Sequence, residues 1–229
     1  YTLRTLFPYT TLFRSNSVKY EMEDKKILIP VVFIPILGII LQILFKDLIL
    51  IWGCTSISLL IYYIFLLELQ FKYDVQTGIR NRVAFEKEME RYGTEEKNAI
   101  IIMFDLNNLK RTNDKHGHKV GDEMIFYAAK IIEKSFMGVG KAYRIGGDEF
   151  CVICNEITRI LLESVLSNLD DLLIKINQKR HIKIVLAYGY AFYNKDENES
   201  INYTFVQADK AMYIHKAKLK EAYGIMEND

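Results

Sequence analysis

The sequence is short of cysteine, of proline and of excess charge of either sign. Its 229 residues include three cysteines, three prolines and one tryptophan, and 30 Lys and Arg residues balance 29 Asp and Glu residues. Three cysteines are too few for a disulfide scaffold. The net charge of +1 provides no basic surface for nucleic acid, so we expect no nucleic-acid partner. The length allows one full-sized soluble domain and a smaller element.

Two of the cysteines, Cys151 and Cys154, lie in one apolar stretch, and Cys54 lies in another. Their Cys-x-x-Cys spacing leaves a metal or redox site open, but no second pair of ligands has a suitable spacing. In a strand the two side chains point to roughly opposite faces. We therefore expect reduced thiols packed in the core, with the metal or redox motif as the alternative.

Long hydrophobic runs are what the sequence has in abundance. Residues 27–45 and 48–67 are almost uninterrupted apolar runs, each close to the length that crosses a bilayer. Both are too long and too close together for a signal peptide. Pro30 and Pro35 are compatible with a membrane helix, because a neighbouring helix can satisfy the carbonyls that proline frees. We predict two transmembrane helices, 27–45 and 48–67; a buried helical hairpin of a soluble protein is the alternative.

Basic residues flank this pair of runs on both sides: Lys19, Lys25 and Lys26 before it, and Lys72, Arg80 and Arg82 after it. The positive-inside tendency places both flanks in the cytoplasm and the connecting loop outside. We therefore expect a multi-pass protein of the inner (cytoplasmic) membrane, with its soluble domain in the cytoplasm.

The first fifteen residues differ from the rest. The chain does not begin with Met, and residues 5–15 (TLFPYTTLFRS) resemble the translation of a common sequencing adapter. We expect residues 1–15 to carry no fold or function, and the natural sequence to continue upstream with further transmembrane helices or a sensor. Residues 16–26 are then a cytoplasmic flank.

From residue 73 onward, strand-like and helix-like patterns alternate. Residues 99–104 (AIIIMF) form a continuous apolar run, typical of a fully buried strand. A helix is predicted over residues 82–92, with Val83, Phe85 and Met89 on one side. Further helices are predicted over 121–136, 157–179 and 205–220, and a strand over 182–193. Strands mixed with helices, together with one hairpin, indicate an α+β fold in which helices cover a sheet.

Residues 144–150 (RIGGDEF) place two glycines and two adjacent carboxylates between strand-like runs. Gly146 and Gly147 predict a tight hairpin turn with positive φ angles. A turn without side chains lets a large, charged ligand approach the backbone. The carboxylates of Asp148 and Glu149 follow, where a ligand at the tip of the hairpin would meet them.

A third carboxylate, Asp105, follows directly on the predicted strand 99–104. If that strand neighbours the hairpin, Asp105 meets Asp148 and Glu149 at one edge of the sheet. Clustered carboxylates with room for phosphate oxygens suit Mg²⁺ or Mn²⁺, and such clusters serve phosphoryl and nucleotidyl transfer. Three solvated turn carboxylates are the alternative.

Four motifs occur in order along the soluble part. Besides RIGGDEF, residues 74–82 (DVQTGIRNR) resemble D-x-L-T-G-L-x-N-R, and residues 105–122 resemble D-x-D-x-F-K…N-D…G-H…G-D. Residues 208–216 (ADKAMYIHK) resemble A-D-x-A-L-Y-x-A-K. Together these motifs, over about residues 74–224, resemble the GGDEF family, the diguanylate cyclases. The resemblance implies a palm-like nucleotidyl-cyclase domain over 74–229, with a central, mostly antiparallel sheet covered by helices.

For function, the resemblance implies that two GTP molecules condense into cyclic di-GMP with release of two pyrophosphates. Each site would hold one GTP, so catalysis would need a homodimer. Residues 68–73 would be a short linker helix between the membrane hairpin of residues 27–67 and the domain. Two alternatives remain: a catalytically silent GTP-binding module, and a membrane sensor or scaffold whose soluble part docks a partner.

The resemblance also implies roles for individual residues. Asp105, the backbone carbonyl of Leu106 and Asp148 would hold Mg²⁺ or Mn²⁺, and Glu149 would contribute to a second metal position. Asp148 is the first candidate for accepting the proton of the ribose 3′-hydroxyl, and Glu149 is the second. Lys110 would stabilise charge that develops on the transferred phosphate.

Other residues would bind the substrate. Asn113 and Asp122 would recognise guanine, because a carboxylate can accept from its ring N–H and exocyclic amine together. His118 would line the same pocket, with a structural role as the alternative. The turn of Gly146 and Gly147 would let the nucleotide approach, and Lys216 and Lys220 would hold the terminal phosphates.

The sequence departs from the family pattern at several positions. Gln76 replaces a leucine, Asn107 replaces the second aspartate of D-x-D, and Leu109 replaces a phenylalanine. Since the first aspartate is the expected metal ligand, we expect activity to survive. Many members carry an R-x-x-D product-inhibition motif, whose positions here read Met137-Gly138-Val139-Gly140. We therefore predict no feedback inhibition through this segment.

Overall fold

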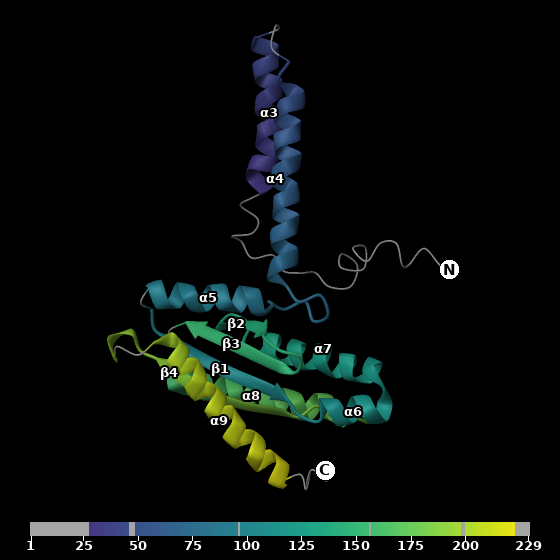
Figure 1. Cartoon of the computed structure of the whole chain (residues 1–229), viewed down its shortest axis with the longest axis vertical. Coiled ribbons are helices and arrows are strands. Elements are labelled where there is room, and N and C mark those ends of the chain that lie inside the picture. The colour runs from purple at the N-terminus through teal and green to yellow at the C-terminus, as the bar shows by residue number, and fades with distance from the viewer. Residues whose placement is uncertain (1–27, 46–48, 96, 156, 198–199, 223–229) are drawn as a thin grey trace. The chain divides into compact units, whose positions relative to one another are not determined.

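The computed structural model describes residues 28–45, 49–95, 97–155, 157–197 and 200–222. The chain divides after Gly78 into two compact units, whose elements are labelled in Figure 1. The first contains the apolar runs, and the second begins at Ile79, within the predicted soluble domain 74–229. Residues 1–15 and the predicted flank 16–26 lie outside the described residues.

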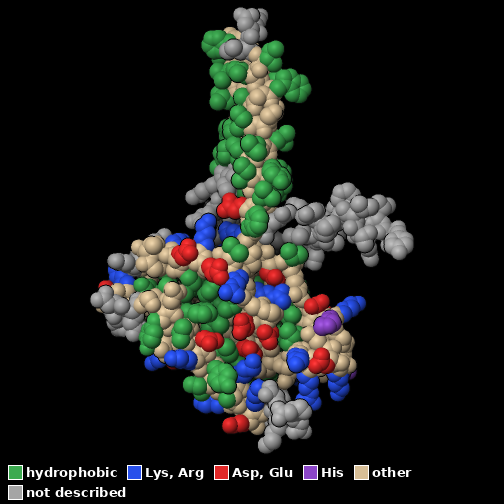
Figure 2. Space-filling view, in the orientation of Figure 1, with side chains coloured by type: hydrophobic (Ala, Val, Ile, Leu, Met, Phe, Trp, Pro, Cys, Tyr) green, Lys and Arg blue, Asp and Glu red, His purple; other side chains and the backbone are tan. Residues whose placement is uncertain are grey.

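The first unit is a hairpin of two apolar helices, α3 (Leu28–Leu44) and α4 (Ile51–Lys72). A Cβ atom at Gly38 would lie 2.8 Å from the Cβ and Sγ atoms of Cys54, so the missing side chain allows the two helices to approach. Hydrophobic side chains cover the outside of the hairpin (Figure 2). Residues Ile51–Glu68 of α4 are long and apolar enough to cross a membrane, whereas α3, with 17 residues, is shorter.

A hydrogen bond between the two helices replaces a backbone hydrogen bond that a proline in α3 cannot make. Pro35 lies inside α3 and has no N–H to donate to the carbonyl of Val31, one turn earlier. The hydroxyl of Ser58 in α4 donates to that carbonyl instead. The expectation that a neighbouring helix satisfies a carbonyl freed by proline is therefore met at this position.

The second unit is built on a four-stranded antiparallel sheet in the order β2-β3-β1-β4. The strands are β1 (Ala99–Leu106), β2 (Gly140–Arg144), β3 (Glu149–Asn155) and β4 (Leu186–Tyr193). All eight residues of β1 are buried, because this strand is central and both of its faces are covered. The antiparallel sheet covered by helices confirms the predicted fold.

Helices cover both faces of the sheet (Figure 1). Ile100, Ile102 and Phe104 point to a core shared with α7 (His118–Ser135) and α8 (Arg159–Gln178). The alternate residues of β1 point to a second core, shared with α5 (Arg82–Glu95) and α9 (Ile201–Ala222). The remaining described helices are α6 (Leu109–His116) and the short η2 (Lys195–Glu197).

The two cysteines of β3 separate onto these two cores. Cys151 belongs to the core under α5 and α9, and Cys154 to the core under α7 and α8. Both thiols are unbonded and buried, and burial raises the pKa of the Cys154 thiol to about 12. The prediction of two core thiols on opposite faces of one strand is confirmed.

Two local predictions about helix and strand positions were wrong. Val83 is exposed, whereas Phe85 and Met89 are buried, because a position two residues away on a helix points to a different side. The strand predicted from residue 182 begins only at Leu186. Before it, the side chain of Asn177 accepts from the N–H of Ile184 and donates to its carbonyl, both at 2.8 Å, so these backbone groups are not available to a neighbouring strand.

The turn between β2 and β3 also differs from its prediction. Positive φ angles occur at Gly78, Gly117 and Gly138 among the described glycines, and not at Gly146 or Gly147. Four residues separate the two strands, and the N–H groups of Ile145 and Gly146 both donate to the carbonyl of Glu149, at 3.0 and 3.3 Å. A turn of this length does not need the left-handed residues of a two-residue hairpin.

Candidate active site

The pairing of β1 with β3 brings the predicted carboxylates together. Asp105 lies opposite Glu149 in the antiparallel register, and the N–H of Leu106 donates to the carbonyl of Asp148 at 2.9 Å. The chain segments that carry all four predicted metal ligands thus meet where β1 ends and β3 begins. We call this region the carboxylate edge.

Asp105 is the buried member of the carboxylate edge, with 5% of its surface exposed. Its Oδ2 atom accepts from the ammonium of Lys216, 2.8 Å away in α9. Its Oδ1 atom is buried and has no hydrogen-bond partner among the described residues. A buried carboxylate oxygen without a donor is costly, so this atom suits a cation.

The pKa of the Glu149 carboxyl is shifted by its surroundings at the carboxylate edge. Partial burial raises the pKa of this carboxyl above its usual range, and the charges of Asp148, Asp105 and Asp209 raise it further. Lys216 acts in the opposite direction. The edge is therefore a region of unbalanced negative charge, which a divalent cation would relieve.

The turn itself is held by an arginine for which the sequence suggested no role. The guanidinium of Arg144 donates to the carbonyl of Gly146 at 3.2 Å and to that of Gly147 at 2.9 Å. Two bonds from one planar group fix the backbone just before Asp148. The sequence feature that could have indicated this contact is an arginine placed shortly before the two glycines.

The two glycines of the turn have different surroundings. A Cβ atom at Gly146 would lie 2.6 Å from Oε2 of Glu149, so a side chain there would displace this carboxylate. A Cβ atom at Gly147 would meet nothing within 4 Å. Gly147 is exposed, and its open side offers the approach predicted for a large ligand.

The predicted guanine residues lie on α6 and α7, which follow β1 in the chain. Asn113 of α6 packs on Gly121 of α7, since a Cβ atom at Gly121 would lie 1.9 Å from the Asn113 Oδ1 atom. That oxygen is buried and has no partner within the described part of the chain. Asp122, the next residue of α7, and His118, its first residue, are both exposed.

The predicted phosphate lysines come from two helices. Lys110 is exposed in the first turn of α6. Lys216 and Lys220 lie one turn apart on α9, so they share one side of that helix. The structure thus brings Lys216 to the carboxylate edge and places Lys220 next along the same side.

Asn107, two residues after Asp105, is a further buried polar residue without a side-chain partner among the described residues. Its side chain is buried, and neither the oxygen nor the nitrogen of its amide has a partner in the described residues. Its backbone N–H donates to the carbonyl of Val185 at 2.9 Å, just before β4. This amide stands where the resembled motif has its second aspartate, so the substitution removes one negative charge from the edge.

A divalent cation fits the donor set of the carboxylate edge, with the unpartnered Asp105 oxygen as the main observation. Over residues 28–45, 49–95, 97–155, 157–197 and 200–222, no three His, Cys, Asp or Glu side chains converge on one point as a ready-made site. The side chains of Asp148 and Glu149 would therefore have to turn toward Asp105 when a cation binds.

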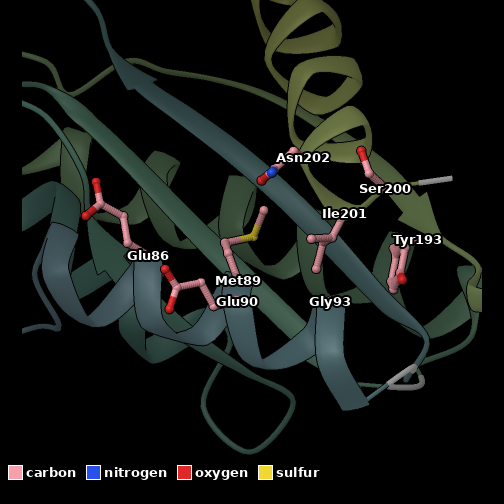
Figure 3. A pocket seen from close by; sticks show the side chains of 8 residues that line it. All are labelled: Glu86, Met89, Glu90, Gly93, Tyr193, Ser200, Ile201 and Asn202. Carbon is pink, nitrogen blue, oxygen red and sulfur yellow. The ribbon is translucent and has the colours of Figure 1, made fainter.

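A hollow of about 430 Å³ lies elsewhere, between α5 and the beginning of α9 (Figure 3). Its lining consists of Glu86, Met89, Glu90, Gly93, Tyr193, Ser200, Ile201 and Asn202. Tyr193 pairs with Ala99 at the start of β1, whereas Asp105 lies near its end. The hollow contains none of the predicted site residues and lies at the opposite end of the sheet.

The family model "Diguanylate cyclase, GGDEF domain" matches residues 71–222. The chain therefore belongs to the GGDEF family. The diguanylate cyclase DgcS of Shewanella oneidensis is 29% identical over 165 residues, covering 69% of this chain and 53% of that protein. The probable diguanylate cyclase DgcJ of Escherichia coli is 27% identical, over 62% of this chain and 29% of its own length.

An uncharacterized membrane protein of Staphylococcus epidermidis is 26% identical over 207 residues, which is 87% of this chain and 55% of that protein. This share exceeds the second unit alone, so the similarity extends into the apolar hairpin. The chain spans about half the length of this relative and of DgcS.

The fold also matches solved structures. The coiled coil and GGDEF domain of DgcB from Caulobacter crescentus, in complex with c-di-GMP, superposes with a TM-score of 0.64 at 22% identity. The match covers 72% of this chain and 91% of that one. The GGDEF domain of FimX from Pseudomonas aeruginosa matches with a TM-score of 0.56 at 19% identity, over 64% of this chain and 94% of that one. These likenesses show the GGDEF fold.

Proposed function

We propose that this chain is a membrane-anchored diguanylate cyclase, a signalling enzyme that condenses two GTP into cyclic di-GMP and two pyrophosphates. The observation that carries the proposal is the carboxylate edge, where buried Asp105, with one unpartnered oxygen among the described residues, lies opposite Glu149 beside an open glycine turn. Its place in a GGDEF domain selects this reaction among nucleotidyl transfers.

In each of two equivalent steps, the 3′-hydroxyl of one GTP attacks the α-phosphorus of the other. The new P–O bond forms as the bond to the β-phosphate breaks, and pyrophosphate leaves with its electron pair. The hydroxyl proton passes to a carboxylate, for which Asp148 is the first candidate and Glu149 the second. No oxidant or reductant is required.

Asp105, the carbonyl of Leu106, Asp148 and Glu149 would hold Mg²⁺ or Mn²⁺. When bound, the metal would polarise the phosphate oxygens and lower the pKa of the attacking hydroxyl. The chain's own residues then position the substrate. Gly147 leaves room for the phosphates, and Arg144 holds the turn through the carbonyls of both glycines.

Asn113 and Asp122 would recognise guanine, with His118 at the edge of the same pocket. The Oδ1 atom of Asn113 is an acceptor without a partner in the described residues, as the exocyclic amine of guanine requires, and the side chain would have to turn away from Gly121 to reach it. Lys110 would stabilise charge on the transferred phosphate, and Lys216 and Lys220 would bind the terminal phosphates.

Two domains, each holding one GTP, would have to face each other, so the active form would be a homodimer. The apolar hairpin would anchor each chain in the inner membrane with both ends in the cytoplasm. Helix α4 runs without interruption to Lys72, so the predicted linker 68–73 is for the most part a continuation of this helix. Such a helix could pass a change in the membrane to the pairing of the two domains.

The proposal is tested by incubating the full chain, in detergent or nanodiscs, with GTP and Mg²⁺ and measuring cyclic di-GMP by chromatography. We expect product from the wild type and a loss of about 10³-fold or more in D148A, since the residue combines two roles. Normal GTP binding with no product would instead support the silent GTP-binding module. The buried Asn107 amide at the motif's aspartate position is the observation that favours that second reading.

A further inference from the structure

The ion pair between Lys216 and Asp105 joins a predicted phosphate ligand to a predicted metal ligand. The Nζ–Oδ2 distance is 2.8 Å, and the side chains of Lys216 and Asp105 are 28% and 8% exposed. The two residues are 111 positions apart in the chain. The ammonium of Lys216 therefore lies beside a buried carboxylate and pairs with the predicted metal ligand.

The ion pair between Lys216 and Asp105 offsets part of the negative charge that is concentrated at the carboxylate edge. Asp105 Oδ1 is buried without a partner in the described part of the chain, and Asp105 pairs with Glu149 in the strand register, where its charge raises the pKa of Glu149. A buried carboxylate without a cation is strongly unfavourable. The ammonium of Lys216 supplies positive charge that the site requires whenever a metal ion is not bound.

Helix α9 is held so that only the lysine side chain needs to move. A Cβ atom at Gly189 of β4 would lie 2.0 Å from the backbone nitrogen of Met212, so helix and strand are in direct backbone contact. Nδ1 of His215 lies 3.0 Å from the backbone nitrogen of Tyr188. These contacts fix the helix around Lys216, while its flexible four-carbon chain allows the ammonium to change partner.

We propose that Lys216 is a resident counter-ion that competes with the divalent cation for Asp105. Arrival of the cation displaces the ammonium, which then becomes available to the terminal phosphates. Metal binding and phosphate binding are coupled in this way through one side chain. The inference rests on the proposed function, because that function makes Asp105 a metal ligand.

The coupling predicts effects of opposite sign from one substitution. Replacing Lys216 by methionine keeps most of the side-chain volume and removes the competing charge. Without nucleotide, K216M should bind Mn²⁺ about tenfold more tightly than the wild type, the effect of losing one charged hydrogen bond. With Mn²⁺ saturating, the same variant should bind a non-hydrolysable GTP analogue about tenfold more weakly, because a phosphate contact is lost.

The experiment uses the full chain in detergent and titrates Mn²⁺, following the EPR signal of the free ion. Three matched variants serve as controls for this titration. K216R keeps the charge and should bind Mn²⁺ as the wild type does. K218M removes a charge from an exposed lysine on the same helix and should also match the wild type. D105N removes the shared carboxylate and should lose the tight Mn²⁺ site.

Two kinds of failure are distinguishable. If D105N loses Mn²⁺ binding but K216M binds as weakly as the wild type, the competition is refuted and the metal site stands. If the wild type and D105N bind Mn²⁺ equally, the proposed metal site itself is refuted, and the competition with it. Should K216M fail to fold by circular dichroism, K216Q, which is also uncharged, carries the same expectation and the same refuting outcome.

Discussion

At the residue scale, Gly146 and Gly147 offer a direct test of how the turn serves the site. Neither has a positive φ angle, so alanine is compatible with the backbone at both positions. In G146A the new methyl group would displace the carboxylate of Glu149, which lies 2.6 Å from the Cβ position. We expect cyclic di-GMP formation to fall about 100-fold, the cost of misplacing a reactive group by about 1 Å.

G147A is the matched control for stability, because its methyl group would meet no atom of the protein within 4 Å. Both variants should keep the wild-type melting temperature, which circular dichroism measures. A G146A protein with full activity would contradict the placement of Glu149. A melting temperature lowered only in G147A would contradict the open surroundings of that residue.

At the element scale, the apolar hairpin depends on a hydrogen bond that a proline made necessary. The S58A substitution would leave the Val31 carbonyl without its donor inside an apolar helix pair. We expect it to lower the free energy of unfolding by about 1 kcal/mol, within the range of hydrogen bonds between membrane helices. Unfolding by SDS in mixed micelles, followed through the fluorescence of Trp52, the single tryptophan, measures this.

A double-mutant cycle separates this bond from general packing. In P35A the backbone N–H of residue 35 can again donate to the Val31 carbonyl, so adding S58A should cost much less than in the wild type. Exposed Ser56, whose hydroxyl donates within its own helix to Trp52, gives the control variant S56A. Equal costs of S58A with and without Pro35 would contradict the compensation.

Elements with strong apolar patterns were predictable from the sequence, and elements set by single polar contacts were not. The buried strand around Ile101 and Ile102 is a continuous apolar run, and its position is confirmed to within two residues at the C-terminal end. Helix α6 (LKRTNDKH) has no apolar periodicity and begins after left-handed Asn108, so no pattern indicated it. The late start of β4 depends on the side chain of Asn177.

The same distinction holds for the site. The meeting of Asp105 with the hairpin was predicted on the condition that its strand neighbours the hairpin, and the pairing of β1 with β3 meets that condition. The ion pair between Lys216 and Asp105 depends on how α9 crosses the sheet, which no local pattern encodes. The two hydrogen bonds from Arg144 to the carbonyls of Gly146 and Gly147 could not be predicted, because they depend on the three-dimensional course of the backbone in the turn.

At the scale of the whole molecule, the activity of the proposed enzyme depends on whether its product, cyclic di-GMP, inhibits it. The segment Met137-Gly138-Val139-Gly140 replaces the arginine and the aspartate of the inhibitory motif. The structure adds a steric reason, because a Cβ atom at Gly140 would lie 2.6 Å from the Sγ atom of Cys154 and 2.9 Å from Val152. In this chain, the side chains of Cys154 and Val152 occupy the space that a carboxylate side chain at position 140 would need.

We therefore expect added cyclic di-GMP to leave the initial rate of the full chain unchanged, because this segment offers neither a guanidinium nor a carboxylate to bind it. Initial rates measured over a range of added product test this, with M137A as the control, since Met137 is exposed. The double variant M137R/G140D should gain no inhibition and should melt at a lower temperature, because the carboxylate introduced at position 140 would collide with β3. Inhibition of the wild type that M137A abolishes would show that the segment does bind product, and would contradict this prediction.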